Sequence, residues 1–455
     1  MSLILVTGCS KSGLESSFVY SDRTLSLVSE AQTGFKESPG VKKLVDERFG
    51  DPQNLRAWQK LPIDFGGFTG TVESFPEGGA AIKEVTLAFE SEDLIPEELS
   101  LVQFVNGSCS GQVASVLRWD AASRTATLSN ALPETPAPGD IVSIGAGDNL
   151  KMGRGLYQRH CSHCHGTSGD GNGPTAQYLY PRPRDYRHGV FKFTTTNDQA
   201  KVSRDDLTRV LRQGIPGTYM PSFLLLADNE IHSLVEYVRF LAIRGEFERK
   251  VVNELSSDYS LTAMTNRVKG GESRSDIISE LKTFMADDLP GYVNDIGDEL
   301  AESWSTANDE EALVAPSIPR IPDSPESRRR GRELYLSKTL NCADCHGIYG
   351  RGDGPQTTIY EKNPVTNELY PEPGLHDVWD NVNQPRVLTQ GIFRGGRRPY
   401  DLFCRLHAGI KGTRMPSFKS VPHEDIWHVV NYVLSIPFEV EPGASGQAST
   451  DAAAE

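Results

Sequence analysis

The amino-acid sequence predicts a mainly helical, multidomain α+β protein, in which a small β-rich domain precedes two related helical domains. The first observation is that a set of landmarks occurs twice, in the same order. The second is that each copy ends with apolar residues at i, i+3, i+4 and i+7, which is typical of an amphipathic helix. These residues are Ile231, Leu234, Val235 and Val238 in the first copy, and Ile426, Val429, Val430 and Val433 in the second. The third is that 66–147 alternates or clusters β-branched residues between turn residues, which favours a small β-sandwich or barrel.

The most informative landmark is Cys-x-x-Cys-His, which begins at Cys161 and again at Cys342. This spacing is the attachment signature of c-type haem. The two thiols add to the two vinyl groups of one porphyrin, and the adjacent histidine binds the iron from one face. We therefore expect two covalently attached haems c. The attachment residues are Cys161, Cys164, Cys342 and Cys345, and the proximal iron ligands are His165 and His346.

Two other uses of paired cysteines compete with haem attachment. Four cysteines in two pairs could bind one structural zinc ion, but such pairs are usually close in sequence, and these lie 181 residues apart. A thioredoxin-like redox pair is the other alternative. The histidine that follows both pairs and the repeated sequence around them favour haem.

The sequence after each histidine is also repeated. Glycine-rich runs at 166–174 and 347–355 permit positive φ angles and close approach of the backbone to a flat ligand. Further on, 214–223 matches 409–418, and each of these segments contains a Met-Pro-Ser-Phe sequence.

With these four landmarks, each copy resembles a class I cytochrome c domain, over about 151–244 and 328–436. The resemblance implies an N-terminal helix, the haem motif, a glycine-rich loop, a Met-Pro segment and a C-terminal helix that packs on the first. It also implies that Met220 and Met415 are the distal iron ligands, although methionine often only fills a core. Arg182 and Arg184 are candidates to neutralise haem propionates, the alternative being ordinary exposed arginines.

An iron with both axial positions filled by His and Met has no open site for substrate, so this ligation predicts one-electron transfer. We expect an electron carrier or a redox subunit with no catalytic residues of its own, working between a quinol-oxidising or dehydrogenase complex and a terminal oxidase of a respiratory chain. The alternative is an enzyme that resembles di-haem cytochrome c peroxidases, which keep one iron open or bound by a second histidine. Two matched Met-Pro segments weigh against it.

The second copy has a longer loop at 356–400, and His407 lies shortly before Met415. His407 aligns with Arg212 of the first copy, so we expect a surface histidine or one near the ligand rather than the ligand itself. His188 has the same interpretation. Cys109 and Cys404 remain after the haem cysteines, and we expect them to be free thiols.

The N-terminus resembles the end of a bacterial lipoprotein signal, with Cys9 as the lipidated residue, although it lacks a basic region and its apolar run is short. No apolar run reaches the length of a membrane-spanning helix. Because c-type haem is attached outside the bacterial inner membrane, we expect a periplasmic protein anchored to the membrane through Cys9.

The formal net charge is −15, but residues 151–244 carry 13 Lys and Arg against 8 Asp and Glu. This local excess predicts a basic rim, including Arg182, Arg187 and Lys192, that faces an acidic redox partner. The alternative is that these cations balance propionates, and nothing supports nucleic-acid binding.

The expected segments are a signal or anchor remnant at 1–15, a helical or irregular lead-in at 16–65, the β-rich domain at 66–147, haem domains at 148–245 and 328–437, an acidic helical insert with a Pro-rich linker at 246–327, and a disordered tail at 438–455.

Overall fold

A computed structural model describes residues 17–25, 27, 40–56, 58–75, 82–91, 93–364 and 366–439. The chain divides into two compact units. The first unit contains Met1–Gly173 and Ala227–Ala301, and the second contains Pro174–Leu226 and Glu302–Glu455. The first haem-motif copy is therefore divided between the units, whereas the second copy lies wholly in the second unit. Cys9, the expected 1–15 anchor and the chain after 439 lie outside the described residues.

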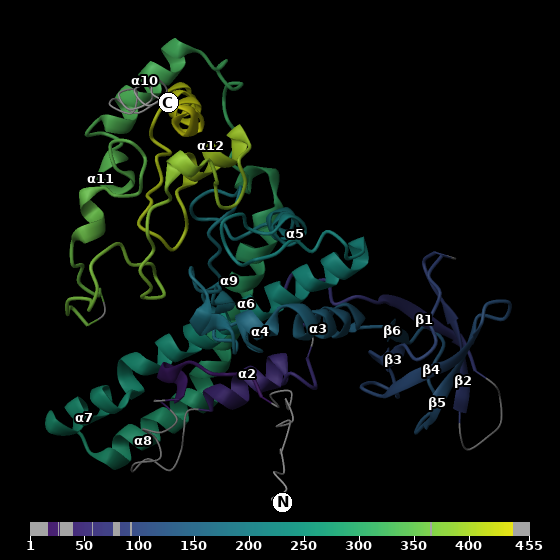
Figure 1. Cartoon of the computed structure of the whole chain (residues 1–455). Coiled ribbons are helices and arrows are strands. Elements are labelled where there is room, and N and C mark those ends of the chain that lie inside the picture. The colour runs from purple at the N-terminus through teal and green to yellow at the C-terminus, as the bar shows by residue number, and fades with distance from the viewer. Residues whose placement is uncertain are drawn as a thin grey trace, which may run out of the picture. The chain divides into compact units, whose positions relative to one another are not determined.

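The β-rich segment is a closed barrel of six antiparallel strands (Figure 1). The strand order around the barrel is β1-β2-β5-β4-β3-β6, and β6 pairs with β1 to close it. The strands are β1 (Phe68–Ser74), β2 (Ile82–Ala88), β3 (Leu101–Phe104), β4 (Val113–Asp120), β5 (Thr125–Leu132) and β6 (Ile141–Ile144). Of the two expected architectures, the sheet therefore takes the barrel form.

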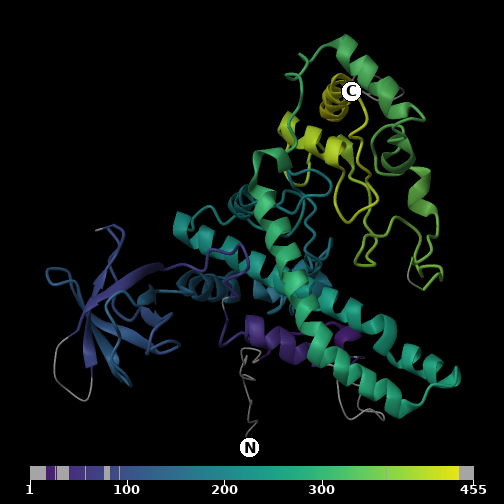
Figure 2. The ribbon, with the colours of Figure 1, turned by 180° about the vertical axis from the view of Figure 1, so that it is seen from behind.

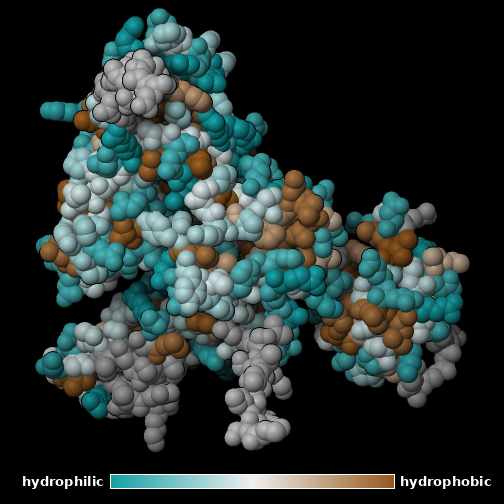
Figure 3. Space-filling view, in the orientation of Figure 1, coloured by the Kyte–Doolittle hydropathy of each residue, from teal (hydrophilic) through white to brown (hydrophobic). Residues whose placement is uncertain are grey.

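Alternation along the strands separates the two faces of the barrel wall. The inward side chains form a closed core that includes Val72, Leu87, Phe104, Val116 and Val142. Several outward positions are also apolar, and brown surface is visible on the barrel in Figure 3. The exposed residues are Leu99, Leu101, Val105, Val113, Leu117 and Ile141.

The helices of the first unit are centred on α6 (Asp228–Tyr259), which is 32 residues long. The others are α2 (Val41–Phe49), α3 (Asp148–His160), α4 (Ser162–His165), α7 (Leu261–Lys269), α8 (Arg274–Thr283), the π-helix η3 (Phe284–Asp288), and α9 (Leu289–Ser305), which ends in the second unit. Glycine lets α3 pack closely on α6, because a Cβ at Gly153 would lie 2.2 Å from the backbone oxygen of Ser233. From α2, Phe49 packs against Phe240 and Phe247 of α6.

The second unit contains the complete second copy and the 174–226 segment of the first (Figure 2). Its α-helices are α5 (Arg204–Gln213), α10 (Pro325–Leu336), α11 (Ala343–His346), α12 (Pro399–Ala408) and α13 (His423–Ser435). Its 3-10 helices are η1 (Ala176–Tyr178), η2 (Tyr186–His188), η4 (Thr306–Asn308), η5 (Glu310–Ala312), η6 (Pro355–Thr358), η7 (Leu388–Gln390) and η8 (Ile436–Phe438).

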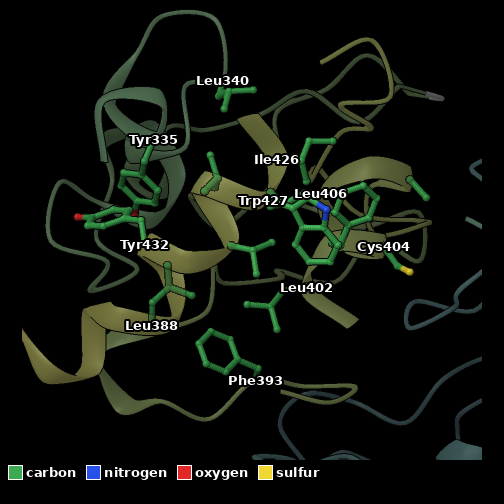
Figure 4. Packing of buried hydrophobic residues seen from close by; sticks show 14 of the residues in the cluster. Tyr335, Leu340, Leu388, Phe393, Leu402, Cys404, Leu406, Ile426, Trp427 and Tyr432 are labelled. Carbon is green, nitrogen blue, oxygen red and sulfur yellow. The ribbon is translucent and has the colours of Figure 1, made fainter. Parts of the chain in front are cut away.

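The core of the second copy lies between α10, α12 and α13 (Figure 4). Tyr335 of α10 meets Tyr432 of α13 edge to face, with ring centroids 5.4 Å apart. A Cβ at Gly331 would lie 2.1 Å from the backbone oxygen of His428, so α10 and α13 are in contact through their backbones. The Pro-rich segment before α10 also packs on α13, since the Trp427 indole N–H donates to the Ile318 carbonyl at 3.2 Å.

Among the described residues, no helix has the combination of length and apolar character needed to cross a membrane. Cys109 and Cys404 are both buried and form no disulfide with any described residue. Cys109 donates to the carbonyl of Glu134, and Cys404 belongs to the core of the second copy.

Candidate haem sites

In the second copy, the haem motif forms a single helical turn, α11, which follows α10 after a short connection. Cys342 caps α11, and Gly347, with φ of 78°, ends that helix directly after His346. The Tyr335 hydroxyl donates to the Gly347 carbonyl at 2.7 Å, and the Gly352 N–H donates to the His346 carbonyl at 2.8 Å. These bonds fix the backbone on both sides of the predicted proximal ligand.

The side chain of His346 is oriented by a backbone group. Its Nδ1 lies 3.1 Å from the Arg386 carbonyl oxygen, which can only accept a hydrogen bond. Nδ1 therefore carries the proton, and Nε2 keeps its lone pair for a metal. Burial lowers the pKa of His346 and is opposed only by this hydrogen bond. A neutral imidazole with a free Nε2 is the form that binds haem iron.

The first copy has the same bonds around its motif. The Tyr157 hydroxyl donates to the Gly166 carbonyl at 2.9 Å, and the Gly171 N–H donates to the His165 carbonyl at 2.9 Å. Gly166, with φ of 72°, ends α4 as Gly347 ends α11. His165 is a buried side chain. The two motifs thus share these backbone hydrogen bonds and the positive-φ glycine that ends the helical turn.

The thiols do not suit the thioredoxin-like alternative. Burial raises the pKa of Cys161 and of Cys342 to about 12. A redox pair of that kind requires the opposite shift, toward the thiolate. The cysteine pairs therefore fit covalent attachment to a vinyl group better than thiol–disulfide exchange.

The predicted distal ligands lie on matching loops of the second unit. In the first loop, Ile215 N–H donates to the Met220 carbonyl at 3.1 Å, and Met220 N–H donates to Thr218 Oγ1 at 3.1 Å. In the second, Ile410 N–H donates to the Met415 carbonyl at 3.2 Å, and Met415 N–H donates to Thr413 Oγ1 at 3.1 Å. The structure thus brings both methionines to equivalent backbone positions. Met415 lies in the same unit as His346, whereas Met220 and His165 lie in different units.

The position of His407 matches that of Arg212. The Ser417 hydroxyl donates to the His407 carbonyl at 2.7 Å, as the Ser222 hydroxyl donates to the Arg212 carbonyl. The His407 ring lies 5.2 Å from the ring of His423, and burial followed by repulsion from His423 lowers its pKa. That His407 is not a ligand stays a prediction, and its shared place with Arg212 supports it.

The expected basic rim is wrong at two of its three positions. The Lys192 side chain is only 11% exposed and forms an ion pair with Asp377 at 2.9 Å. Arg187 is 18% exposed and pairs with Asp185 at 2.8 Å. Only Arg182 is exposed. The charge count could not reveal the pairing of Lys192, because Asp377 comes from the long loop of the second copy.

Arg184 is also inside the second unit. Its guanidinium carbon lies 3.6 Å from the ring centroid of Trp379, and burial lowers its pKa to about 10. Arg184 therefore fits a propionate-neutralising role better than Arg182 does. Sequence reasoning did not assign a role to Trp379, Arg386 or Arg394, although all three lie in the 356–400 loop that sets the second copy apart.

Both motifs fall inside regions that match known families. Residues 148–238 match the family described as "Cytochrome C oxidase, cbb3-type, subunit III", and residues 329–437 match the family described as "Cytochrome c". The chain contains two cytochrome c domains. Such domains bind haem c and transfer electrons, and a six-stranded barrel precedes the pair.

Similarity to individual proteins is weaker. A chain of the reducing HAO-like protein complex from Kuenenia stuttgartiensis is similar at 22% sequence identity and a TM-score of 0.43, over 63% of this chain and 96% of that chain. A similarity at this level carries no argument about function. No curated protein matches the chain.

Proposed function

We propose that this cytochrome is a di-haem electron carrier, or the redox subunit of a complex, with two covalently attached haems c. One Cys pair would hold each haem, and His165 and Met220 would bind the iron of the first haem while His346 and Met415 would bind that of the second. The haem supplies the one-electron couple. The protein excludes water, fixes the ligands and presents the two sites to donor and acceptor.

One observation carries this proposal: the same hydrogen bonds hold the backbone beside the two histidines and the backbone of the two methionines in both copies. An enzyme of the peroxidase kind needs one iron that differs from the other by an open or weakly bound position. The matched loops instead support two sites of the same kind, each with a methionine ligand.

The direct test is the haem content and ligand-binding behaviour of the purified holoprotein. A pyridine haemochrome assay is expected to give about two c-type haems per chain. The reduced native protein is expected not to bind carbon monoxide, whereas Met220→Ala and Met415→Ala are each expected to open one site to it. Carbon monoxide binding or peroxidase turnover by the native protein would instead support the enzyme alternative.

We also propose that the protein works in the bacterial periplasm and is anchored through lipidated Cys9, as a link between a quinol-oxidising or dehydrogenase complex and a terminal oxidase. Two or more acyl chains hold a protein firmly at a membrane, because each buried CH₂ contributes about 0.8 kcal/mol. Cys9→Ser, expressed behind a complete export signal, is expected to move the protein from the membrane fraction to the soluble periplasm. Retention of this variant in membranes would contradict lipid anchoring.

Exposed apolar side chains beside Met220 support contact with a redox partner at the first copy. Tyr219 and Leu224 are each 66% exposed, and Leu225 is fully exposed. Because Lys192 and Arg187 are internally paired, we expect this contact to depend more on apolar burial than on charge steering. Leu225→Glu is expected to slow reduction by the physiological donor without changing either haem potential. An unchanged rate would place the contact elsewhere.

A further inference from the structure

The second methionine loop and the residue that follows it carry three cations at positions where the first copy has neutral residues. These are Lys411, Arg414 and Lys419, in place of Pro216, Tyr219 and Leu224. Two of the cations precede Met415 in the sequence and one follows it. Their contacts can therefore hold the loop on both sides of the predicted ligand.

Arg414 is paired with the long loop of the second copy. Its Nε lies 3.0 Å from Glu361 Oε1, and the Glu361 side chain is only 19% exposed. The other carboxylate oxygen of Glu361 accepts the His376 N–H at 2.8 Å. The Glu361 carbonyl accepts the Tyr370 N–H at 2.9 Å, and the Tyr370 ring stacks on that of His376 with centroids 3.7 Å apart. Glu361 is thus held in place independently of Arg414.

Lys419 is paired with a segment of the first copy that belongs to the same compact unit. Its Nζ lies 2.8 Å from Asp198 Oδ2, and the hydrogen bond from Lys419 is the first cause of a lowered pKa at Asp198. The backbone beside Asp198 is fixed as well, since the Asn197 N–H donates to the Ala312 carbonyl at 2.8 Å. Asp198 therefore also lies on an ordered support.

Lys411 reaches the same segment but contributes differently. Its Nζ donates to Thr196 Oγ1 and to the Ala200 carbonyl at 2.7 and 2.6 Å. Burial lowers the pKa of Lys411 to about 8, so desolvation of its ammonium group opposes the gain from these bonds. The ion pairs of Arg414 and Lys419, which are more exposed, are the contacts whose removal leaves no buried charge behind.

These outer contacts add to the hydrogen bonds that both methionine loops share. The shared bonds join residues within each loop, whereas the two ion pairs join the second loop to other parts of its unit. A ligand on a loop binds only while the loop holds it in the competent position, and the fraction of the protein in that state scales its apparent affinity. Support of this kind around a ligand is what keeps a site in its productive geometry.

We propose that Glu361 and Asp198 are positioning residues, which hold the second methionine loop before and after Met415 and so keep the Met415 thioether on the iron. This inference rests on the proposed function, in which Met415 is an axial ligand. Each carboxylate acts through a cation of the chain beside Met415. Tyr219 and Leu224 cannot form such ion pairs, so this support is specific to the second copy.

The test is displacement of the methionine by imidazole, a neutral base that binds haem iron. It uses the Met220→His holoprotein at neutral pH, in which the methionine–iron charge-transfer band of the oxidised protein reports on Met415 alone. Glu361→Gln keeps an acceptor and removes the charge. We expect it to lower the imidazole concentration that halves the band by about two- to fivefold, the effect of a partly exposed ion pair.

Asp198→Asn is expected to have a similar or smaller effect, because Lys419 is 58% exposed. The matched control is Glu372→Gln, which removes a carboxylate charge from an exposed position of the same long loop. It is expected to leave the imidazole concentration unchanged.

A double-mutant cycle separates the ion pair from a general structural role of Glu361. In an Arg414→Gln background, Glu361→Gln is expected to have no further effect. Arg414→Lys keeps the cation and is expected to retain most of the native resistance to imidazole. If Glu361→Gln had the same effect with and without Arg414, Glu361 would not act through this ion pair and the inference would be overturned.

The inference is also overturned if Glu361→Gln and Asp198→Asn release Met415 at the same imidazole concentration as Glu372→Gln. The proposed function fails differently, through a Met220→His protein that lacks the charge-transfer band or one whose band survives Met415→Ala. A band that disappears in Met415→Ala but resists imidazole equally in all three carboxylate variants would leave the carrier function intact and remove only the positioning role.

Discussion

The methionine loops at 214–223 and 409–418 have the same internal hydrogen bonds but different neighbours. A Cβ at Gly217 of the first loop would meet Ile392 and Arg386 at 3.1 and 3.2 Å, whereas one at Gly412 of the second would meet Trp379 at 2.7 Å. All three neighbours come from the loop at 356–400, which is longer than its counterpart in the first copy, and a Cβ at Gly412 would also meet Val190 of the first copy at 3.2 Å. The comparison shows that the repeat has kept the bonds that place the predicted iron ligands, and that Trp379, from the longer loop, distinguishes the surroundings of the second methionine loop.

Arg386 contacts both copies, through its backbone in one and through its side chain in the other. Its carbonyl accepts the hydrogen bond from His346 inside the second copy, while its side chain packs on Gly217 of the first. The side chain is fixed by donating to the Ile392 carbonyl at 2.7 Å and to Gln390 Oε1 at 3.0 Å. A single residue thus contacts the predicted proximal ligand of one haem and the distal loop of the other.

The largest loss of stability is expected from substitution of the glycines at which two helices of each copy cross in close contact. Gly153→Ala and Gly331→Ala would each place a Cβ about 2 Å from a backbone oxygen of the facing helix, and backbone cannot move aside as a side chain can. We expect each to lower the free energy of unfolding by about 3 kcal/mol or more and to reduce haem incorporation in its own copy. Thermal unfolding and haem content measure this.

Gly155→Ala is the control, because a Cβ there would meet nothing within 4 Å although it lies on the same helix α3. It is expected to be neutral or slightly stabilising. If Gly153→Ala proved as harmless as Gly155→Ala, α3 and α6 could not cross as described.

The second largest effect is expected at Lys411, a residue that differs between the two copies. Lys411 stands where the first copy has Pro216, and its Nζ donates to Thr196 Oγ1 and to the Ala200 carbonyl at 2.7 and 2.6 Å. Burial lowers the pKa of Lys411 from 10.5 to about 8. The unfolded chain therefore holds this proton where the folded chain has lost it, so the contribution of Lys411 to stability rises between about pH 8 and 10.5.

Lys411→Met keeps most of the stem and removes the titration. Relative to this variant, the native protein is expected to gain up to roughly 3 kcal/mol of unfolding free energy across that pH window. Chemical denaturation at a series of pH values measures the difference. If the unfolding free energies of the two proteins changed with pH in the same way, folding would not lower the pKa of Lys411.

The smallest effect tests the equivalence of the motifs. Tyr157→Phe and Tyr335→Phe each remove a hydroxyl that donates to the carbonyl of the glycine after the proximal histidine. Each is expected to cost about 1–2 kcal/mol, because a buried carbonyl loses its partner. The expected result is a similar loss in both variants, measured by denaturation. A large loss of unfolding free energy in only one variant would show that the tyrosine hydrogen bond contributes differently to the two motifs.

The sequence was sufficient for features that are local or repeated. Spacing alone placed Cys161, His165, Cys342 and His346, and the family matches confirm the cytochrome c domains around them. Period-two alternation predicted a β-rich segment, but not whether it closes, because closure depends on the pairing of β1 with β6 across the whole segment. The equivalence of His407 and Arg212 also came from local alignment alone.

Sequence reasoning failed where distant segments pair. Lys192 contributes to the local basic excess, yet it is paired with Asp377, which lies 185 positions away in the sequence. Trp379 packs against both Arg184 and Gly412, which come from two different copies. Periodicity and motif spacing carry no information on such contacts, and the extra residues of the 356–400 loop could not be interpreted by comparison with the shorter loop of the first copy.

The most direct test of two matched His/Met sites is the methionine–iron charge-transfer band of the oxidised protein. We expect Met220→Ala and Met415→Ala each to remove about half of the band per chain, and the double variant to remove all of it, with about two haems retained in every case. A single variant that leaves the band unchanged, or one that abolishes it entirely, would contradict the account, because the two copies would then not hold their irons in the same way.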